Sequence, residues 1–309
     1  MPNALLWTIQ LIFVPVISPF FIGVIRKIKA WFQNRAGADI WQPYRDLRKL
    51  FRKGEVVSED ASWIFRFAPY IIFAVTLSLG ASIPILTVLR PVGFLGDFIS
   101  LVYLVALGTF FLALAGIDAG SAFGGFGSSR EMTMAALTEG GLFFSILSVA
   151  FLAHTTNVFG ISAAIASLPL ADFLPVLLAF AAFIVAMLAE TARFPFDNPA
   201  THLELTMIHE AMILEYSGPR LALLEWAAAN KLLIFMTLGI NLFLPWGIAV
   251  EVGWSAVASA FLWYMLKVLG LSFFIAVLES TIAKYRFFRL PDLLLTSFIL
   301  TLIAVSLIL

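Results

Sequence analysis

The chain has 309 residues, of which 61% are hydrophobic and only 12% are charged. Soluble globular domains carry about 25% charged residues, so this composition predicts an integral membrane protein. The 19 basic and 19 acidic side chains balance, which gives no support to a nucleic-acid partner. The sequence contains no cysteine, so the chain has no thiolate to ligate an iron–sulfur cluster and no disulfide.

Eight apolar segments are long enough to cross a bilayer core of about 30 Å as helices, which takes roughly 20 residues. They predict an all-α polytopic fold with about eight transmembrane helices, forming a single domain over residues 1–309. The first segment lacks a basic region and a cleavage site, so we interpret it as a span rather than a signal peptide. The segments are 4–25, 67–89, 97–117, 132–152, 173–190, 229–250, 256–278 and 291–308.

Lysine and arginine are distributed unequally between the connections. The first connection, 26–66, holds ten of the nineteen, whereas the three even-numbered connections hold only Arg90. Basic residues accumulate in cytoplasmic loops, so we expect the odd-numbered loops to face the cytoplasm and both termini to face outward. The remaining odd-numbered connections add Arg130, Arg193, Arg220, Lys284, Arg286 and Arg289.

Two loop segments carry further patterns. PYRDLRKLFRK, from Pro43, places proline at a plausible first helical position and apolar residues along one side. It predicts an interfacial helix on anionic headgroups within loop 26–66; a solvated loop would explain the charge but not the apolar stripe. The glycine-rich stretch 116–129 lacks the Gly-Lys-Ser/Thr ending of a P-loop, so we expect a flexible turn there rather than a phosphate site.

Residues 189–218, AETARFPFDNPATHLELTMIHEAMILEYSG, concentrate ionisable side chains beside the fifth predicted span. They lie largely within an acidic cytoplasmic loop that we expect over residues 191–228. Ionisable groups next to hydrocarbon are costly, so such a cluster indicates an ion pathway or a partner surface. His202 and His209 do not match the His-Glu-x-x-His spacing of zinc sites, so the sequence predicts no metal site there.

Other ionisable residues fall inside the predicted spans. Glu131 and Glu139 are eight residues apart in the fourth span, so they share a helix face. Lys231 opens the sixth span, where it can also extend to the headgroups, and Lys267 lies near the middle of the seventh. A charge at mid-bilayer costs about 3 kcal/mol, so it requires a partner or a water-filled cavity. If water joins these carboxylates and lysines, protons can pass between them, so we predict a proton path along these residues.

The motifs resemble one family: the membrane subunit shared by respiratory complex I, where it is also known as subunit 1, and energy-converting membrane-bound nickel–iron hydrogenases, including formate hydrogenlyase. The resemblance runs nearly end to end, through QNRAGADIWQPYRDLRKLF, SSREM, AETARFPFD and EYSG. Two departures resemble the hydrogenase branch. The link between the Phe-Asp and Glu-Tyr-Ser-Gly elements is about one helical turn longer, and Glu279 stands where the complex I branch tends to have arginine.

The resemblance implies a multi-pass subunit of the prokaryotic inner membrane that is not a complete enzyme alone. Such a subunit anchors a hydrophilic redox arm and couples it to ion translocation through antiporter-like membrane subunits. Its cytoplasmic partners are an iron–sulfur small subunit and a hydrogenase-like large subunit. These partners carry iron–sulfur clusters and a nickel–iron centre, and this chain holds no cofactor. Both departures put quinone binding in doubt.

Carried onto matching positions, the family's acidic path corresponds to Glu131, Glu190, Glu204 and Glu215. Physical grounds add Glu139, Lys231 and Lys267. The residues expected to brace the loops or contact partners are Arg35, Arg193, Asp197, His202 and His209.

Two other functions stay open. One is the quinone-site subunit of a complex I. The other is a stand-alone secondary ion transporter, which is expected to show an inverted repeat with interrupted helices. The sequence shows no convincing repeat, and the basic first loop has no counterpart in the second half.

Overall fold

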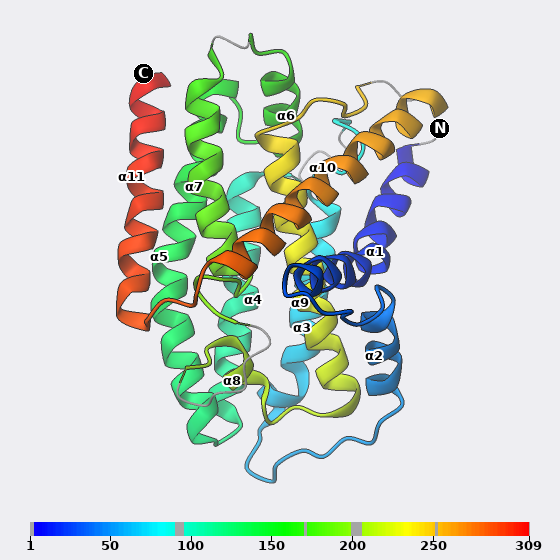
Figure 1. Cartoon of the computed structure of the whole chain (residues 1–309), viewed down its shortest axis with the longest axis vertical. Helices are drawn as coiled ribbons and strands as arrows, with labels where there is room; N and C mark the ends of the chain where they lie inside the picture. The colour runs from blue at the N-terminus through cyan, green and yellow to red at the C-terminus, as the bar shows by residue number, and fades with distance from the viewer. Residues whose placement is uncertain (1–2, 90–95, 170–171, 199–205, 251–252, 309) are drawn as a thin grey trace.

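The computed structural model is a bundle of α-helices (Figure 1). It describes residues 3–89, 96–169, 172–198, 206–250 and 253–308, with the backbone alone for residues 3–7. In this part of the chain, seven helices are long and apolar enough to cross a membrane. They are α1 (Asn3–Phe32), α3 (Trp63–Ala81), α4 (Phe98–Asp118), α5 (Ala122–Ala153), α9 (Gly218–Leu242), α10 (Trp254–Thr281) and α11 (Leu290–Ile308).

The remaining predicted span forms α7 (Leu174–Glu190), which at 17 residues is at the lower limit for a crossing helix. The predicted all-α polytopic fold is thus confirmed, with seven long helices and one shorter apolar helix among the described residues. The short helices are α2 (Gln42–Phe51), α6 (Val158–Ala166), α8 (His209–Ile213) and the 3-10 helix η2 (Phe287–Arg289).

Helices α3 and α9 both end eight residues before the predicted spans do, because Pro84 and Pro245 follow the two ends and cannot continue a helix. The segments beyond the helices meet at one isolated bridge between Thr87 and Ala249. Val88 N donates to Ala249 O at 3.2 Å. Asn241 Nδ2 donates to the carbonyls of Pro84 and Ile85, at 2.7 and 2.9 Å. Buried extended segments are as apolar as helix, so hydropathy alone extended both spans too far.

The glycine-rich stretch 116–129 is not the flexible turn that we expected. Only residues 119–121 form a turn, and the Ser121 side chain then caps α5 by accepting a bond from Gly124 N at 3.0 Å. A Cβ on Gly124 would lie 2.2 Å from the Gly116 carbonyl oxygen. The glycine therefore allows α4 and α5 to approach closely, which composition does not distinguish from flexibility.

Helix α2 forms within loop 26–66 as predicted, with Pro43 in its first turn. Its apolar side packs against α1 and α9. Pro43, Leu47 and Leu50 line a central cavity, whereas Arg48 and Lys49 are exposed. The apolar stripe expected on headgroups is therefore only partly covered by protein, and Phe51 at its end is exposed.

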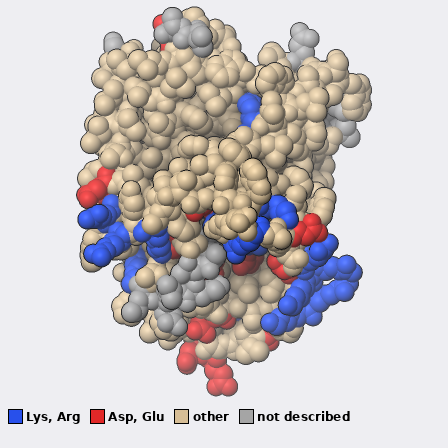
Figure 2. All heavy atoms as spheres, viewed as in Figure 1, with Lys and Arg blue, Asp and Glu red and all other residues tan. Residues whose placement is uncertain are grey.

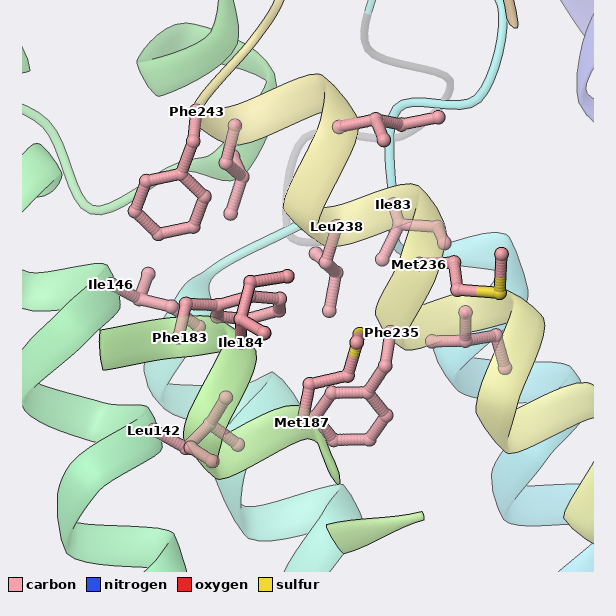
Figure 3. Close-up of a cluster of buried hydrophobic side chains, with 14 of the residues drawn as sticks. Ile83, Leu142, Ile146, Phe183, Ile184, Met187, Phe235, Met236, Leu238 and Phe243 are labelled. Atoms are coloured by element: carbon pink, nitrogen blue, oxygen red, sulfur yellow. The ribbon is translucent and has the colours of Figure 1, made fainter. Parts of the chain in front are cut away.

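A large apolar core fills the space between α5, α7 and α9 (Figure 3). Ile146 of α5, Phe183 and Met187 of α7, and Phe235 and Leu238 of α9 are all buried there. Phe183 and Met187 are one helical turn apart and share a face. Apolar contact alone drives helix association weakly in a bilayer, so this core stabilises the bundle mainly through close packing.

Charged residues collect at one end of the bundle. Figure 1 shows the N-terminal end of α1 and the C-terminal end of α11 at the top, opposite α2 and α8. Figure 2 shows most Lys, Arg, Asp and Glu side chains in the lower half, with an almost uncharged upper half. Termini at the same end agree with the even number of crossings predicted from the sequence.

Candidate functional site

A cavity of about 700 Å³ lies inside the charged half of the bundle. It extends from the exposed Arg35 in the first loop to Thr76 and Thr109 on α3 and α4. Apolar residues of these two helices, such as Val105, share the lining with ionisable residues. The ionisable residues on its lining are Arg26, Lys29, Arg35, Asp46, Glu131, Glu190, Arg193, His209, Glu210, Glu225, Lys231 and Glu279.

Glu190, the last residue of α7, forms a buried ion pair on this lining. Lys231 Nζ of α9 lies 2.7 Å from Glu190 Oε1. Thr109 Oγ1 of α4 donates to the same oxygen at 3.3 Å. The carboxylate side chain is 3% exposed and the lysine side chain 23% exposed. The pair therefore joins three helices, with its ammonium more open to the cavity.

Glu279, near the end of α10, forms a second buried cluster. Lys29 Nζ of α1 lies 2.9 Å from one carboxylate oxygen, and Arg193 Nη1 lies 3.0 Å from the other. Arg193 lies three residues after the end of α7. Ala192 has a left-handed φ of 50°, and Arg193 N donates to Leu188 O at 2.8 Å, so the chain turns back against the end of the helix. Each carboxylate oxygen thus has its own cationic donor, and the cluster ties α10 and α1 to the loop after α7.

Asp197 organises the segment between α7 and α8. Its carboxylate accepts bonds from the backbone N–H groups of Ile208 and His209, at 3.2 and 3.0 Å. Lys284 Nζ lies 2.6 Å from the carboxylate and also donates to Thr206 O. These contacts fix the start of α8 against the segment that follows α10.

Helix α8 places two titratable side chains, His209 and Glu210, on the cavity lining. Burial, reinforced by the Lys231 ammonium and opposed by the Asp197 carboxylate, lowers the pKa of His209 to about 4. Burial, reinforced by the carboxylates of Glu225 and Asp197, raises the pKa of Glu210 to about 7. Near neutral pH, His209 is therefore uncharged and Glu210 is partly protonated.

The structure brings together half of the residues selected from the sequence. These cavity-lining residues are Glu131, Glu190, Lys231, Arg35, Arg193 and His209. They come from α5, α7, α8, α9 and the loops after α1 and α7, so chain folding rather than local spacing assembles them.

The other selected residues lie elsewhere. Glu139 is half-buried two turns beyond Glu131 on α5, about 12 Å along the helix, and does not line the cavity. Glu215 is exposed between α8 and α9. Glu204 and His202 lie outside the described residues.

Lys267, a residue of α10, does not line the cavity and lies beside the C-terminal end of α9. Its Nζ donates to Asn241 Oδ1 at 3.2 Å and to the Leu244 carbonyl at 3.0 Å. The ammonium therefore interacts with the C-terminal end of α9, where the helix dipole favours a cation.

Sequence reasoning did not select Lys29, Glu210, Glu225 or Glu279 for the site, although all four line the cavity. In the sequence, Glu279 stands out only because the complex I branch of the family tends to have arginine at this position. A carboxylate near a predicted span end, opposite a basic loop, is a signal that points to such a cluster. Among the residues that the structure describes, no group of three or more His, Cys, Asp or Glu is placed to hold a metal ion.

The fold and the cavity define a polytopic helical membrane protein with a charged inner cavity lined by inter-helix ion pairs. A model of the NADH dehydrogenase family matches residues 5–309, so the chain belongs to this family.

Individual relatives come from both hydrogenase-type complexes and complex I. Hydrogenase-4 component C of Escherichia coli K12 is 36% identical over 282 residues, covering 90% of this chain and 87% of the relative. Formate hydrogenlyase subunit 4 of the same organism is 31% identical over 278 residues, covering 90% of each. A subunit of the NADH-quinone oxidoreductase of Anaplasma marginale is 28% identical over 295 residues, covering 89% and 83%. The family and branch predicted from the loop motifs are confirmed.

A solved structure shares the fold. One chain of the membrane-bound sulfane sulfur reductase, an archaeal respiratory membrane complex, matches with a TM-score of 0.84 over 100% of both chains, at 20% identity. The two chains therefore share the arrangement of their helices over their whole length.

Proposed function

We propose that this chain is the membrane-anchoring, proton-path subunit of a nickel–iron hydrogenase or hydrogenase-like complex. The cavity carries this proposal, because a space of about 700 Å³ with two buried ionic clusters is a costly feature in an apolar bundle. The similarity to hydrogenase-4 component C and formate hydrogenlyase subunit 4 favours the hydrogenase branch.

The cavity residues offer a sequence of proton-binding groups. Glu210 and Glu225 lie nearest the charged end, and Glu131 and the Glu190–Lys231 pair lie further in. Water in the cavity would join these groups, and protons would pass between carboxyls of similar proton affinity. Glu139, further along α5, would continue the path towards antiporter-like membrane subunits.

The charged end would face the cytoplasm of a prokaryotic inner membrane, with both termini outward. An iron–sulfur small subunit and a hydrogenase-like large subunit would dock at this end, where Arg35 and Glu215 are exposed. The iron–sulfur clusters and the nickel–iron centre would belong to those partners, because this chain has no cysteine.

Purification and reconstitution test the proposal. A tagged chain should co-purify with iron–sulfur subunits, and the whole complex in proteoliposomes should evolve hydrogen with proton transport. Glu131→Gln should lower the number of protons moved per hydrogen molecule in an assembled complex. Glu59→Gln, an exposed carboxylate outside the cavity, is the matched control and should change nothing.

Other outcomes would select other functions. A chain that purifies alone or as a homo-oligomer would favour a stand-alone transporter. NADH-dependent reduction of added quinone by the purified complex would favour the complex I alternative.

A further inference from the structure

A second hollow lies on the outside of the bundle, between α1, α2 and α9, and has a volume of about 430 Å³. Pro15 and Val16 of α1, Phe51 of α2 and Trp226 of α9 make its walls apolar. Val16 is 52% exposed, so the slot is accessible from the surface. It is therefore a groove rather than a closed cavity.

The polar groups of the groove walls are already paired with one another. Pro19 has no N–H, so the carbonyl of Pro15 loses its helical partner; Trp226 Nε1 donates to it at 2.8 Å. The Tyr44 hydroxyl donates to the carbonyl of Val16 at 2.5 Å. The groove thus presents mainly apolar surface, which suits a hydrocarbon chain.

The rim of the groove is basic. Arg48 and Arg52 both line it, and because they are four residues apart on and just after α2, they project from the same side. In the described part of the chain, neither guanidinium lies within 4.0 Å of a carboxylate. Figure 2 shows basic side chains gathered at the lower right, where Figure 1 places α2, directly below the uncharged half.

We propose that this groove binds one anionic glycerophospholipid, with an acyl chain between α1, α2 and α9 and the phosphate on Arg48 and Arg52. The acyl chain gains little free energy by leaving the bilayer, because both environments are apolar. Selectivity therefore comes from the headgroup. Each arginine near the surface contributes about 1 kcal/mol towards an anionic lipid, so two give roughly a 30-fold preference over a zwitterionic lipid.

The groove adjoins the central cavity, because Pro19 and Leu47 line both. A bound lipid would therefore cover the outer side of the cavity wall and limit its exchange with the bilayer. This sealing role rests on the proposed function, whereas the lipid site itself does not.

Native mass spectrometry of the whole complex tests the site. The complex is exchanged into mixed micelles that contain equal amounts of chain-matched phosphatidylglycerol and phosphatidylcholine. The unmodified complex should retain phosphatidylglycerol with the preference given above. Arg48→Gln with Arg52→Gln should abolish that preference, and Val16→Trp, which fills the slot, should displace the lipid with both arginines intact.

Lys49→Gln with Lys53→Gln is the matched control, because it removes the same charge at the same spacing outside the groove. It should leave the preference unchanged. If both double variants lose the preference for phosphatidylglycerol equally, the lipid is attracted by a diffuse basic surface and the proposed site is wrong. Equal retention of the two lipids, or a quinone in place of the phospholipid, would also overturn it. None of these measurements requires redox activity, so failure of the proposed function would not mimic any of them.

Discussion

We expect removal of Glu190 and removal of Lys231 to lower the stability of the fold by different amounts. In Glu190→Gln, the neutral amide still accepts a hydrogen bond from Lys231, and the freed ammonium is 23% exposed at the cavity. Loss of the charge-assisted part of the bond should cost about 1–1.5 kcal/mol, the difference between a hydrogen bond to a charged group and a neutral one. In Lys231→Met, the carboxylate, which is 3% exposed, loses its cation, and the cost should rise to about 3–5 kcal/mol.

The double variant, Glu190→Gln with Lys231→Met, removes both charges together. Its loss of stability should be smaller than the sum of the two single losses by about 0.5–3 kcal/mol, which is the usual coupling between residues in contact. Thermal unfolding of the purified complex, followed by the fluorescence of its tryptophans, gives the order of midpoints. Size-exclusion chromatography of the same samples reports whether the hydrophilic partners remain bound.

Proton transport in proteoliposomes separates the two roles of the pair. All three variants should lose coupled proton uptake, including the double variant, in which no unpaired charge remains. If Lys231→Met unfolds at the same midpoint as Glu190→Gln, the stability of the buried carboxylate does not depend on that cation. Normal proton uptake in an assembled Glu190→Gln complex would remove Glu190 from the path.

Three further predictions concern other parts of the chain. Lys267→Met should leave proton uptake intact but lower the unfolding midpoint, because the buried Asn241 Oδ1 loses its donor at a cost of about 1–3 kcal/mol; loss of uptake in an assembled variant would contradict this. Glu210 has a folded pKa of about 7, above its usual 4.5, so its contribution to stability is full below pH 4.5 and disappears as the pH rises through 7. Melting curves of Glu210→Gln should therefore fall less between pH 5 and 8 than those of the unmodified chain, and parallel curves would refute the shift. Gly23→Ala should destabilise by about 1–3 kcal/mol, because its Cβ would lie 1.9 Å from the Ile40 carbonyl oxygen. Gly270→Ala, with nothing within 4 Å, should be neutral or stabilising in the same melting assay, and equal effects of the two substitutions would exclude the clash.

The sequence predicted the bounds of α4, α7 and α11 to within one residue, whereas α1 ends seven residues after the predicted span and α5 and α9 begin ten and eleven residues before theirs. The predicted span 97–117 became Phe98–Asp118, because the Asp97 side chain accepts a bond from Ile99 N at 3.0 Å and starts the helix there. The span 291–308 became Leu290–Ile308. The late ends at 67–89 and 229–250 share one cause, since the apolar run was followed past Pro84 and Pro245, each of which stands three residues beyond the helix end.

The site could be predicted only as separate residues. The charge beside hydrocarbon identified Glu190 and Lys231 individually, but the 41 positions between them say nothing of a 2.7 Å contact. Glu279 and its partner Lys29 are 250 positions apart and meet only because α1 and α10 pack together. The expectation for Lys267 rested on the cost of an unpaired charge, and the early end of α9 supplies carbonyl acceptors that hydropathy concealed.

Stability does not explain why the cavity keeps its ion pairs. Replacing a buried pair by apolar residues of similar volume is often neutral or stabilising by about 1–4 kcal/mol, whereas removal of one partner costs more. A bundle selected for stability would therefore lose both members of Glu190–Lys231 together, as many of the residues that line the cavity are already apolar. The Glu279 cluster is different, because its three side chains tie α1 and α10 to the loop after α7 and so fix the cavity wall. Glu190–Lys231 is consequently the pair whose charge itself requires a function, and the double variant is the substitution that separates that function from folding.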